Sequence, residues 1–241
     1  MIKVEHLKKN YGDVTALVDV SFQLDRGEVV ALLGGNGSGK STSINILTGL
    51  LKHDSGHVSI QGIDPFKDPI KARQNLGVFP DKMGLFPHLT VREHLEFFGG
   101  IQGLQGEALN EAIATTIEKL NMEDIADRRT KGFSHGQSVK VALGRAIIHD
   151  PDYLILDEPT RGLDVYAVRQ LRKMLLALKE QGTGILFSSH VMQEVEILSD
   201  RIAVIADGKI CAEGSKEQLK TLAKTDVLED AFMTLVSGEQ P

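Results

Sequence analysis

The chain has 241 residues, 41% of them hydrophobic and 25% charged, a balance that is ordinary for a soluble globular protein. A formal net charge of −6 provides no overall basic field, so we expect no nucleic acid partner. The single cysteine, Cys211, excludes an intramolecular disulfide framework and fits a reducing compartment. The N-terminus has no apolar signal-peptide core, and no window approaches the roughly 18 apolar residues of a membrane span. We therefore expect a cytoplasmic protein.

The N-terminal part of the chain alternates polar and apolar residues in short stretches separated by turn residues. These stretches are "IKVEHLKKNYG", "VSFQLDRGE" and "GHVSIQG", all within residues 1–63. Such alternation is typical of antiparallel strands that have one face buried and one face in solvent. We predict an antiparallel β layer here.

A glycine-rich loop follows the apolar run "VVALLGG" (29–35) and precedes a short helical pattern. It matches G-x-x-x-x-G-K-[ST], which in this strand–loop–helix context predicts a phosphate-binding loop. Its backbone N–H groups and the helix N-terminus would face phosphate oxygens, Lys40 would bridge the terminal phosphates, and the Ser41 hydroxyl would hold Mg²⁺. The predicted nucleotide-binding residues of the loop are Gly34, Gly35, Asn36, Gly37, Ser38, Gly39, Lys40, Ser41 and Thr42.

Between Leu89 and Ile148 the pattern becomes helical, with apolar residues every three or four positions. In "EALNEAIATTIEKLNM" these residues form one stripe, which we interpret as core packing. The stripe consists of Leu109, Ile113, Ile117 and Leu120.

Later in the chain, short apolar runs bounded by turn residues alternate with helices. They are "YLILDEP" (153–159), "GILFSSH" (184–190) and "RIAVIADG" (201–208). Runs of this kind predict parallel strands that are buried on both faces. The fold class is therefore α/β, with a parallel sheet flanked by helices.

Two of these predicted strands end in side chains suited to nucleotide chemistry. Asp157 would orient Mg²⁺ or its waters, and Glu158 would polarise the attacking water. A helix cap or a solvated strand end explains one acid more readily than two in succession. His190 ends another predicted strand and would lie at the same edge of the sheet, near the phosphates.

In this order, the motifs resemble the ATP-binding subunit of an ABC transporter over nearly the whole chain. "YLILDEP" is similar to Walker B, "TRGLD" (160–164) to the D-loop with Asp164, and "SSHVMQEVEILSDRIAVI" to the switch-histidine segment. Tyr11 stands where the family has an aromatic residue that stacks on adenine. The resemblance implies one ABC ATPase domain over 1–241. Its ATP-binding P-loop NTPase core, with the β layer, would be 1–84 and 150–241, and its inserted α-helical subdomain 85–149.

The resemblance also implies cofactors, partners and a working cycle. Two ATPase subunits meet head to tail and hold ATP between the Walker A loop of one and the signature motif of the other. ATP binding with Mg²⁺ closes the dimer, and hydrolysis reopens it. The expected partners are an integral-membrane permease and a second ATPase subunit, either a second copy or a related chain. The permease would hold the chain at the inner face of the cell membrane. GTP is disfavoured, since no N-K-x-D segment is present.

"FSHGQ" (133–137) is similar to the ABC signature, with His135 at a position that usually carries glycine. Its residues Ser134 and Gln137 form an S-x-x-Q capping box, which predicts a helix start. Gly136 is retained, whereas the His135 ring is bulky and disfavours positive φ. The ring either points away, contacts the γ-phosphate, or obstructs closure. We expect a functional but slowed site, because Lys40, Asp157, Glu158 and His190 are all present.

Asp81, in "GVFPD", is the second departure from the family, which usually has glutamine at this joint. A carboxylate suits magnesium, so Asp81 is a candidate metal ligand together with Ser41 and Asp157. Because aspartate is one methylene shorter than glutamine, it would demand tighter closure or an intervening water.

The segment 76–104 resembles ATPases that serve bacterial exporters of drugs, polysaccharides or sodium ions. There, Leu85, Phe86 and Pro87 are candidates either for contact with the membrane partner or for packing within a loop. The expected function is ATP hydrolysis that powers transport, in the export direction. The alternatives are a soluble ABC-type ATPase, which usually has a duplicated domain or a coiled coil, and a weakly hydrolysing nucleotide-dependent regulator.

Overall fold

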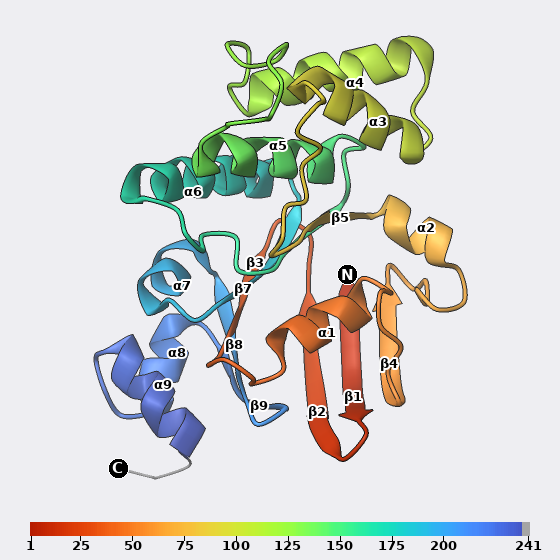
Figure 1. The fold of residues 1–241 in the computed structure, drawn as a ribbon. Helices are drawn as coiled ribbons and strands as arrows, with labels where there is room; N and C mark the ends of the chain where they lie inside the picture. Colours follow the sequence, from red (N-terminus) through yellow and green to blue (C-terminus); the bar gives the residue numbers. More distant parts are fainter. Residues whose placement is uncertain (238–241) are drawn as a thin grey trace.

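The computed structural model describes residues 1–237 and has the α/β architecture that the sequence predicts (Figure 1). Residues 238–241, at the end of the predicted domain, lie outside the described part. The strands are β1 (Ile2–Tyr11), β2 (Val14–Leu24), β3 (Val29–Leu33), β4 (Ser55–Ile60), β5 (Leu76–Phe79), β6 (Tyr153–Leu156), β7 (Gly184–Ser189), β8 (Arg201–Ala206) and β9 (Lys209–Gly214). Within residues 1–237 they form one nine-stranded sheet in the order β4-β1-β2-β9-β8-β3-β7-β6-β5.

The predicted antiparallel layer is confirmed. Strand β1 pairs antiparallel with both β2 and β4, so that Ile2 lies opposite Leu24 on one side and Ile60 on the other. All three of these side chains are fully buried. The polar–apolar alternation of this segment thus corresponds to one buried face of the layer and one face in solvent.

The parallel part of the sheet is also confirmed. Strand β3 pairs parallel with β7 and β8, and β6 pairs parallel with β5 and β7. Every residue of β3, β6 and β7 is buried, as the continuous apolar runs predict. Strand β9 is antiparallel to β8 and joins this part of the sheet to β2.

Helices cover both faces of the sheet. They are α1 (Lys40–Leu47), α2 (Pro69–Gln74), α3 (Val91–Ile101), α4 (Gly106–Lys119), α5 (His135–Ile147), α6 (Val165–Glu180), α7 (Met192–Leu198), α8 (Lys216–Leu222) and α9 (Leu228–Ser237). Alternate residues of β3 enter different apolar cores. Val29, Ala31 and Leu33 pack in the core that includes residues of α3 to α6, whereas Val30 and Leu32 pack with α1 and the antiparallel layer.

The helical character predicted between Leu89 and Ile148 corresponds to α3, α4 and α5, which lie together at one end of the molecule (Figure 1). Ile113, Ile117 and Leu120 are buried in their shared core, and Leu109 packs against it. The interpretation of this stripe as core packing is therefore confirmed. The exact division between core and helical subdomain stays a prediction. No helix within residues 1–237 combines the length and apolar character needed to cross a membrane.

The parallel register gathers the predicted site at one edge of the sheet. Leu33 lies opposite Ser189, and Leu156 lies opposite both Phe187 and Phe79. Strands β3, β5, β6 and β7 therefore end close together. The segments that leave these strands carry the phosphate loop, Asp81, the acidic pair and His190. Ligands of α/β sheets bind outside the carboxyl ends of parallel strands, so this edge is where a ligand is expected.

Candidate functional site

The glycine-rich loop joins β3 to α1 with a backbone that side chains would disturb. A Cβ on Gly34 would lie 2.3 Å from the carbonyl oxygen of Ile205. Gly39 has φ 110°, in the left-handed region that favours glycine, and stands at the N-cap of α1 without a side-chain cap. The N-terminal N–H groups of α1 are therefore left for another acceptor.

Lys40 opens α1 and is only 6% exposed. Its Nζ donates to the carbonyl oxygens of Gly34, at 2.8 Å, and Gly35, at 3.0 Å, and lies 3.5 Å from Oε1 of Glu158. The Ser38 hydroxyl is buried and has no hydrogen-bond partner among residues 1–237. A buried cation, an unpartnered hydroxyl and uncapped N–H groups together fit the phosphates of a nucleotide.

The acidic pair is tied to its surroundings by two serines. Asp157 Oδ1 accepts from Ser188 Oγ at 2.6 Å and from Ser41 Oγ at 3.2 Å. Ser188 Oγ in turn accepts from the backbone N–H of Glu158 at 2.9 Å. Sequence reasoning missed Ser188, whose only signal is a hydroxyl residue within a buried apolar run. The oxygens of Ser41 and Asp157 are the donor type that Mg²⁺ prefers.

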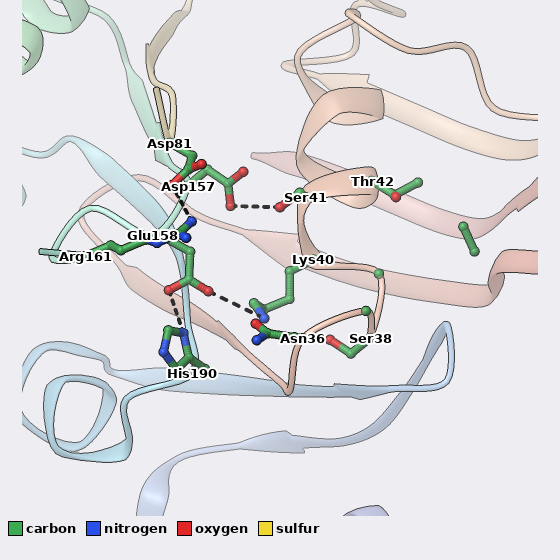
Figure 2. Close-up of a pocket in the computed structure, with 13 residues that line it drawn as sticks. Asn36, Ser38, Lys40, Ser41, Thr42, Asp81, Asp157, Glu158, Arg161 and His190 are labelled. Carbon is green, nitrogen blue, oxygen red and sulfur yellow. Dashed lines mark hydrogen bonds and ion pairs between the residues drawn. The ribbon is translucent and has the colours of Figure 1, made fainter. Parts of the chain in front are cut away.

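Glu158 lies between Lys40 and His190, as Figure 2 shows. Its Oε2 is 2.9 Å from Nδ1 of His190, and because a carboxylate only accepts, the imidazole proton of this bond is on Nδ1. Glu158 has φ 48°, a left-handed conformation that is uncommon for a residue other than glycine. Backbone conformations of this kind cluster at functional sites.

Asp81 follows β5 and reaches the same cleft (Figure 2). Its Oδ1 is 3.1 Å from Nη1 of Arg161, a residue that sequence reasoning did not select. The cleft has a volume of about 480 Å³. Its lining residues are Ala16, Asn36, Gly37, Ser38, Gly39, Lys40, Ser41, Thr42, Asp81, Asp157, Glu158, Arg161 and His190.

Three predicted nucleotide-binding residues are placed differently from the others. Tyr11 is half-exposed at the end of β1, with the Lys9 ammonium 5.8 Å from its ring centre, and it is not among the cleft-lining residues. Gly34 and Gly35 do not line the cleft either, but their carbonyl groups hold Lys40.

The signature residues line a second cleft, of about 370 Å³, together with Asp164, which caps α6 by accepting from Ala167 N–H at 2.8 Å. The predicted capping box is confirmed. Gln137 N–H donates to Ser134 Oγ, and Ser134 N–H donates to Gln137 Oε1. His135 begins α5 and is not among the residues with positive φ, so its ring imposes no strain of that kind. Its Nε2–H donates to the carbonyl oxygen of Arg161 at 3.1 Å.

Phe86 packs within its loop, which is one of the two roles expected for it. Its N–H donates to Nε2 of His94 at 2.9 Å, and its carbonyl accepts from Thr130 Oγ1 at 2.9 Å. Its ring packs against those of His94, Phe97 and Phe98, yet the residue remains 45% exposed. Burial lowers the pKa of His94, which keeps Nε2 available as an acceptor.

One carboxyl group beside the cleft has a shifted pKa. Burial raises the pKa of Glu194, on α7, while the hydroxyl of Thr160 donates to its carboxylate and opposes the shift. Thr160 lies in the segment that leads from Glu158 to α6, so this contact connects α7 with the acidic strand end.

The phosphate loop between a buried strand and a helix, faced by carboxylates on neighbouring strand ends, defines a P-loop nucleotide-binding protein. Comparison with known proteins gives the particular family. The family described as ABC transporter matches residues 17–161. The chain belongs to this family, and its relatives are ATP-binding proteins of such transporters.

Among those relatives is the ABC transporter ATP-binding protein NatA of Bacillus subtilis (strain 168), 38% identical over 93% of this chain and 92% of that protein. The linearmycin resistance ATP-binding protein LnrL of the same organism is 39% identical over 91% of this chain and 70% of that protein. The fold matches the solved ATP binding subunit of an ABC transporter with a TM-score of 0.88 and 30% identity, over 98% and 99% of the two chains. The dimeric structure of MJ0796, a bacterial ABC transporter cassette, matches with a TM-score of 0.79 and 27% identity, over 89% of this chain and 98% of that chain.

Proposed function

We propose that this ATP-binding subunit hydrolyses ATP with Mg²⁺ and thereby powers export through an integral-membrane permease. The observation that carries the proposal is the row Lys40–Glu158–His190 across the cleft, beside the phosphate loop. Relatives named for linearmycin resistance and for Nod factor export support the export direction.

The cleft residues have complementary roles in this proposal. Lys40 exchanges the carbonyl oxygens of Gly34 and Gly35 for oxygens of the terminal phosphates, while Asn36 to Thr42 surround the phosphate chain. Ser41 and Asp157 would hold Mg²⁺, and Asp81 would be a further ligand once released from Arg161. Mg²⁺ held by these residues would supply charge neutralisation on the phosphate oxygens during transfer.

Glu158 acts as the base that orients and polarises the attacking water. His190 fixes this carboxylate through its Nδ1–H, and Lys40 contacts the other oxygen, so both oxygens of Glu158 have a defined direction. The left-handed backbone of Glu158 and its N–H bond to Ser188 hold the base against the end of β6.

The dimer is the second element of the proposal. Within one chain, residues 134–137 line a different cleft from residues 36–42, so one chain does not close its signature motif over its own nucleotide. A head-to-tail pair, either two copies or this chain with a related ATPase, brings Ser134, His135, Gly136 and Gln137 to the partner's ATP. Similarity to a dimeric cassette supports this arrangement. Asp164 then faces the dimer interface, and Tyr11 stacks on adenine after closure.

The permease contact is assigned to the half-exposed loop with Leu85, Phe86 and Pro87. Phe86 is held by hydrogen bonds on both sides of its backbone and still presents ring surface to solvent, which suits an apolar anchor. This contact places the chain at the inner face of the cell membrane, in the cytoplasm.

The experiment that tests the proposed reaction is the substitution Glu158→Gln. The variant keeps the shape of the side chain but lacks the base, so we expect ATP-dependent dimers to accumulate and phosphate release to fall strongly. Size-exclusion chromatography with ATP and Mg²⁺ and a phosphate assay measure both effects. Glu180→Gln, at the exposed end of α6, is the matched control. Turnover of Glu158→Gln at the parental rate would exclude Glu158 as the base.

A weakly hydrolysing regulator is the second candidate, and the engagement of Asp81 by Arg161 favours it. The substitution His135→Gly separates slow hydrolysis caused by the His135 ring from other causes. A large gain in turnover indicates that the ring hinders closure. Unchanged turnover indicates that histidine is tolerated, as its helical backbone suggests.

A further inference from the structure

Arg161 lies where the two clefts approach each other. It follows the acidic strand end in a turn in which its N–H donates to the carbonyl oxygen of Glu158 at 3.1 Å. Leu163 N–H closes the next turn by donating to the carbonyl oxygen of Thr160 at 3.1 Å. The position of Arg161 is thus set by the same backbone that carries the proposed base.

The side chain of Arg161 faces the nucleotide cleft. Its Nη1 is 3.1 Å from Oδ1 of Asp81, and both residues line this cleft beside Asp157 and Ser41. The Asp81 oxygen that pairs with Arg161 is therefore close to the proposed magnesium ligands. Because the guanidinium and a cation prefer the same carboxylate, they compete for it.

The carbonyl oxygen of Arg161 faces the signature motif. It accepts from Nε2–H of His135 at 3.1 Å, and a Cβ on the following residue, Gly162, would lie 3.6 Å from that nitrogen. Gly162 has φ 75°, so the turn brings the backbone close to the imidazole without a side chain between them. The two departures from the family pattern, Asp81 and His135, therefore contact one and the same residue.

We propose that Arg161 is a positioning residue that connects the metal side of the nucleotide cleft with the signature helix of the same chain. While the guanidinium holds Asp81, the turn is fixed and its carbonyl oxygen holds the His135 ring. When Asp81 turns to Mg²⁺, the turn loses this anchor, and His135 becomes free to move toward a partner's nucleotide. Thermodynamic linkage makes the effect mutual, so a loss of the His135 contact also changes magnesium affinity. This inference rests on the proposed function for the roles of the two clefts.

The first test uses the protein without nucleotide, so it does not depend on ATP turnover. Imidazole ¹⁵N spectra report the ring of His135, whose signals are identified among the eight histidines by their loss in His135→Gln. We expect the parental ring to be protonated on Nε2, and we expect Arg161→Gln and Asp81→Asn to shift its signals. Arg161→Lys retains the charge and should restore most of the parental spectrum. Arg169→Gln, an exposed arginine on α6, is the matched control and should change nothing.

The second test measures the Mg²⁺ concentration at half-maximal binding of a fluorescent ATP analogue. Arg161→Gln frees Asp81, so this midpoint should fall, by up to about fivefold because exposed ion pairs change an equilibrium by no more than that. In the Asp81→Asn background the same substitution should have no effect. Thermal unfolding of each variant confirms that it is folded.

Either of two results overturns the proposal. One is an unchanged His135 spectrum in folded Arg161→Gln, and the other is a midpoint shift of equal size with and without Asp81. Absence of ATP turnover in the parental protein together with the expected spectra would instead contradict the proposed ATPase function and leave the connection intact.

Discussion

The two clefts differ in how much of each is complete within one chain. In the nucleotide cleft, Asp157 is 9% exposed and bonded to Ser41 and Ser188, and Glu158 is held by Lys40 and His190. In the signature cleft, the bonds of Ser134 and Gln137 cap their own helix. The first cleft is built from strand ends of one chain that hold one another in place, whereas the second is lined by the N-terminus of α5.

This difference follows from secondary structure. Parallel strands bring residues that are distant in sequence to one edge, so a site built there is cross-linked by the sheet itself. A capped helix N-terminus forms from a few adjacent residues and needs no partner to fold, but it offers only backbone N–H groups and a partial positive charge. In the proposed dimer, the second cleft therefore gains its role from what the other chain brings to it.

Replacement of the buried Lys40 should have the largest effect on turnover of any substitution in the nucleotide cleft. Lys40→Ala deletes the buried ammonium between the loop carbonyl groups and Glu158, so the first cleft loses the cation that we propose binds the terminal phosphates. We expect turnover to fall by about 100- to 1,000-fold, the effect of removing one preorganised electrostatic contact to a transition state. Phosphate release at saturating ATP measures this. Lys52→Ala, an exposed lysine beyond α1, is the control, and an equal loss in both variants would contradict the assignment.

Ser188→Ala tests how strongly the hydroxyl of β7 links the two acidic residues of the nucleotide cleft. The substitution removes a fully buried hydroxyl that donates to Asp157 and accepts from Glu158 N–H, leaving both groups short of a partner. The free energy of unfolding should fall by about 1–3 kcal/mol. Urea unfolding measures it. Ser189→Ala, next along β7, loses only the bond from Val191 N–H and should cost less. An equal loss of free energy of unfolding in the two variants would show that the hydrogen bond between Ser188 and Asp157 does not stabilise the fold more than the bond of Ser189 does.

The sequence predicted most of the strands, the phosphate loop and the positions of the acidic pair and His190 at strand ends, because each has a recognisable local pattern. The capping box of Ser134 and Gln137 was predictable for the same reason. The links between these motifs had no such pattern. Ser188 is one more residue in a buried strand, and Arg161 is one charged residue in an exposed turn. Their roles arise only when β6, β7 and the start of α5 pack together.

Two expectations on single residues show the same limit. The sequence left three orientations open for the ring of His135, and the structure places this residue in the first turn of α5 with its Nε2–H directed at the carbonyl oxygen of Arg161. Tyr11 lies outside the lining of the nucleotide cleft and is half-exposed at the end of β1. Both outcomes depend on the neighbouring segment of the fold rather than on the motif itself.

The smallest expected effect concerns Glu194, which joins α7 to the turn after Glu158 through Thr160. Burial raises its pKa above the ordinary value of 4.5, so the folded chain holds this proton more tightly than the unfolded chain does. The resulting stability is fully present below that ordinary value and is lost as the pH rises through the raised pKa. Glu194→Gln keeps an acceptor for Thr160 without the charge. The free energy of unfolding of this variant, relative to that of the parental protein, should therefore increase as the pH rises.

Because Glu194 is only partly buried, we expect this gain to stay within about 1 kcal/mol. Urea unfolding at a series of pH values between 4 and 8 measures the difference between the two proteins at each pH. Glu180→Gln removes an exposed carboxylate and controls for the loss of one negative charge. A difference that declines with rising pH has the wrong sign for a buried carboxyl. It would mean that the hydroxyl of Thr160 stabilises the ionised form more than burial destabilises it.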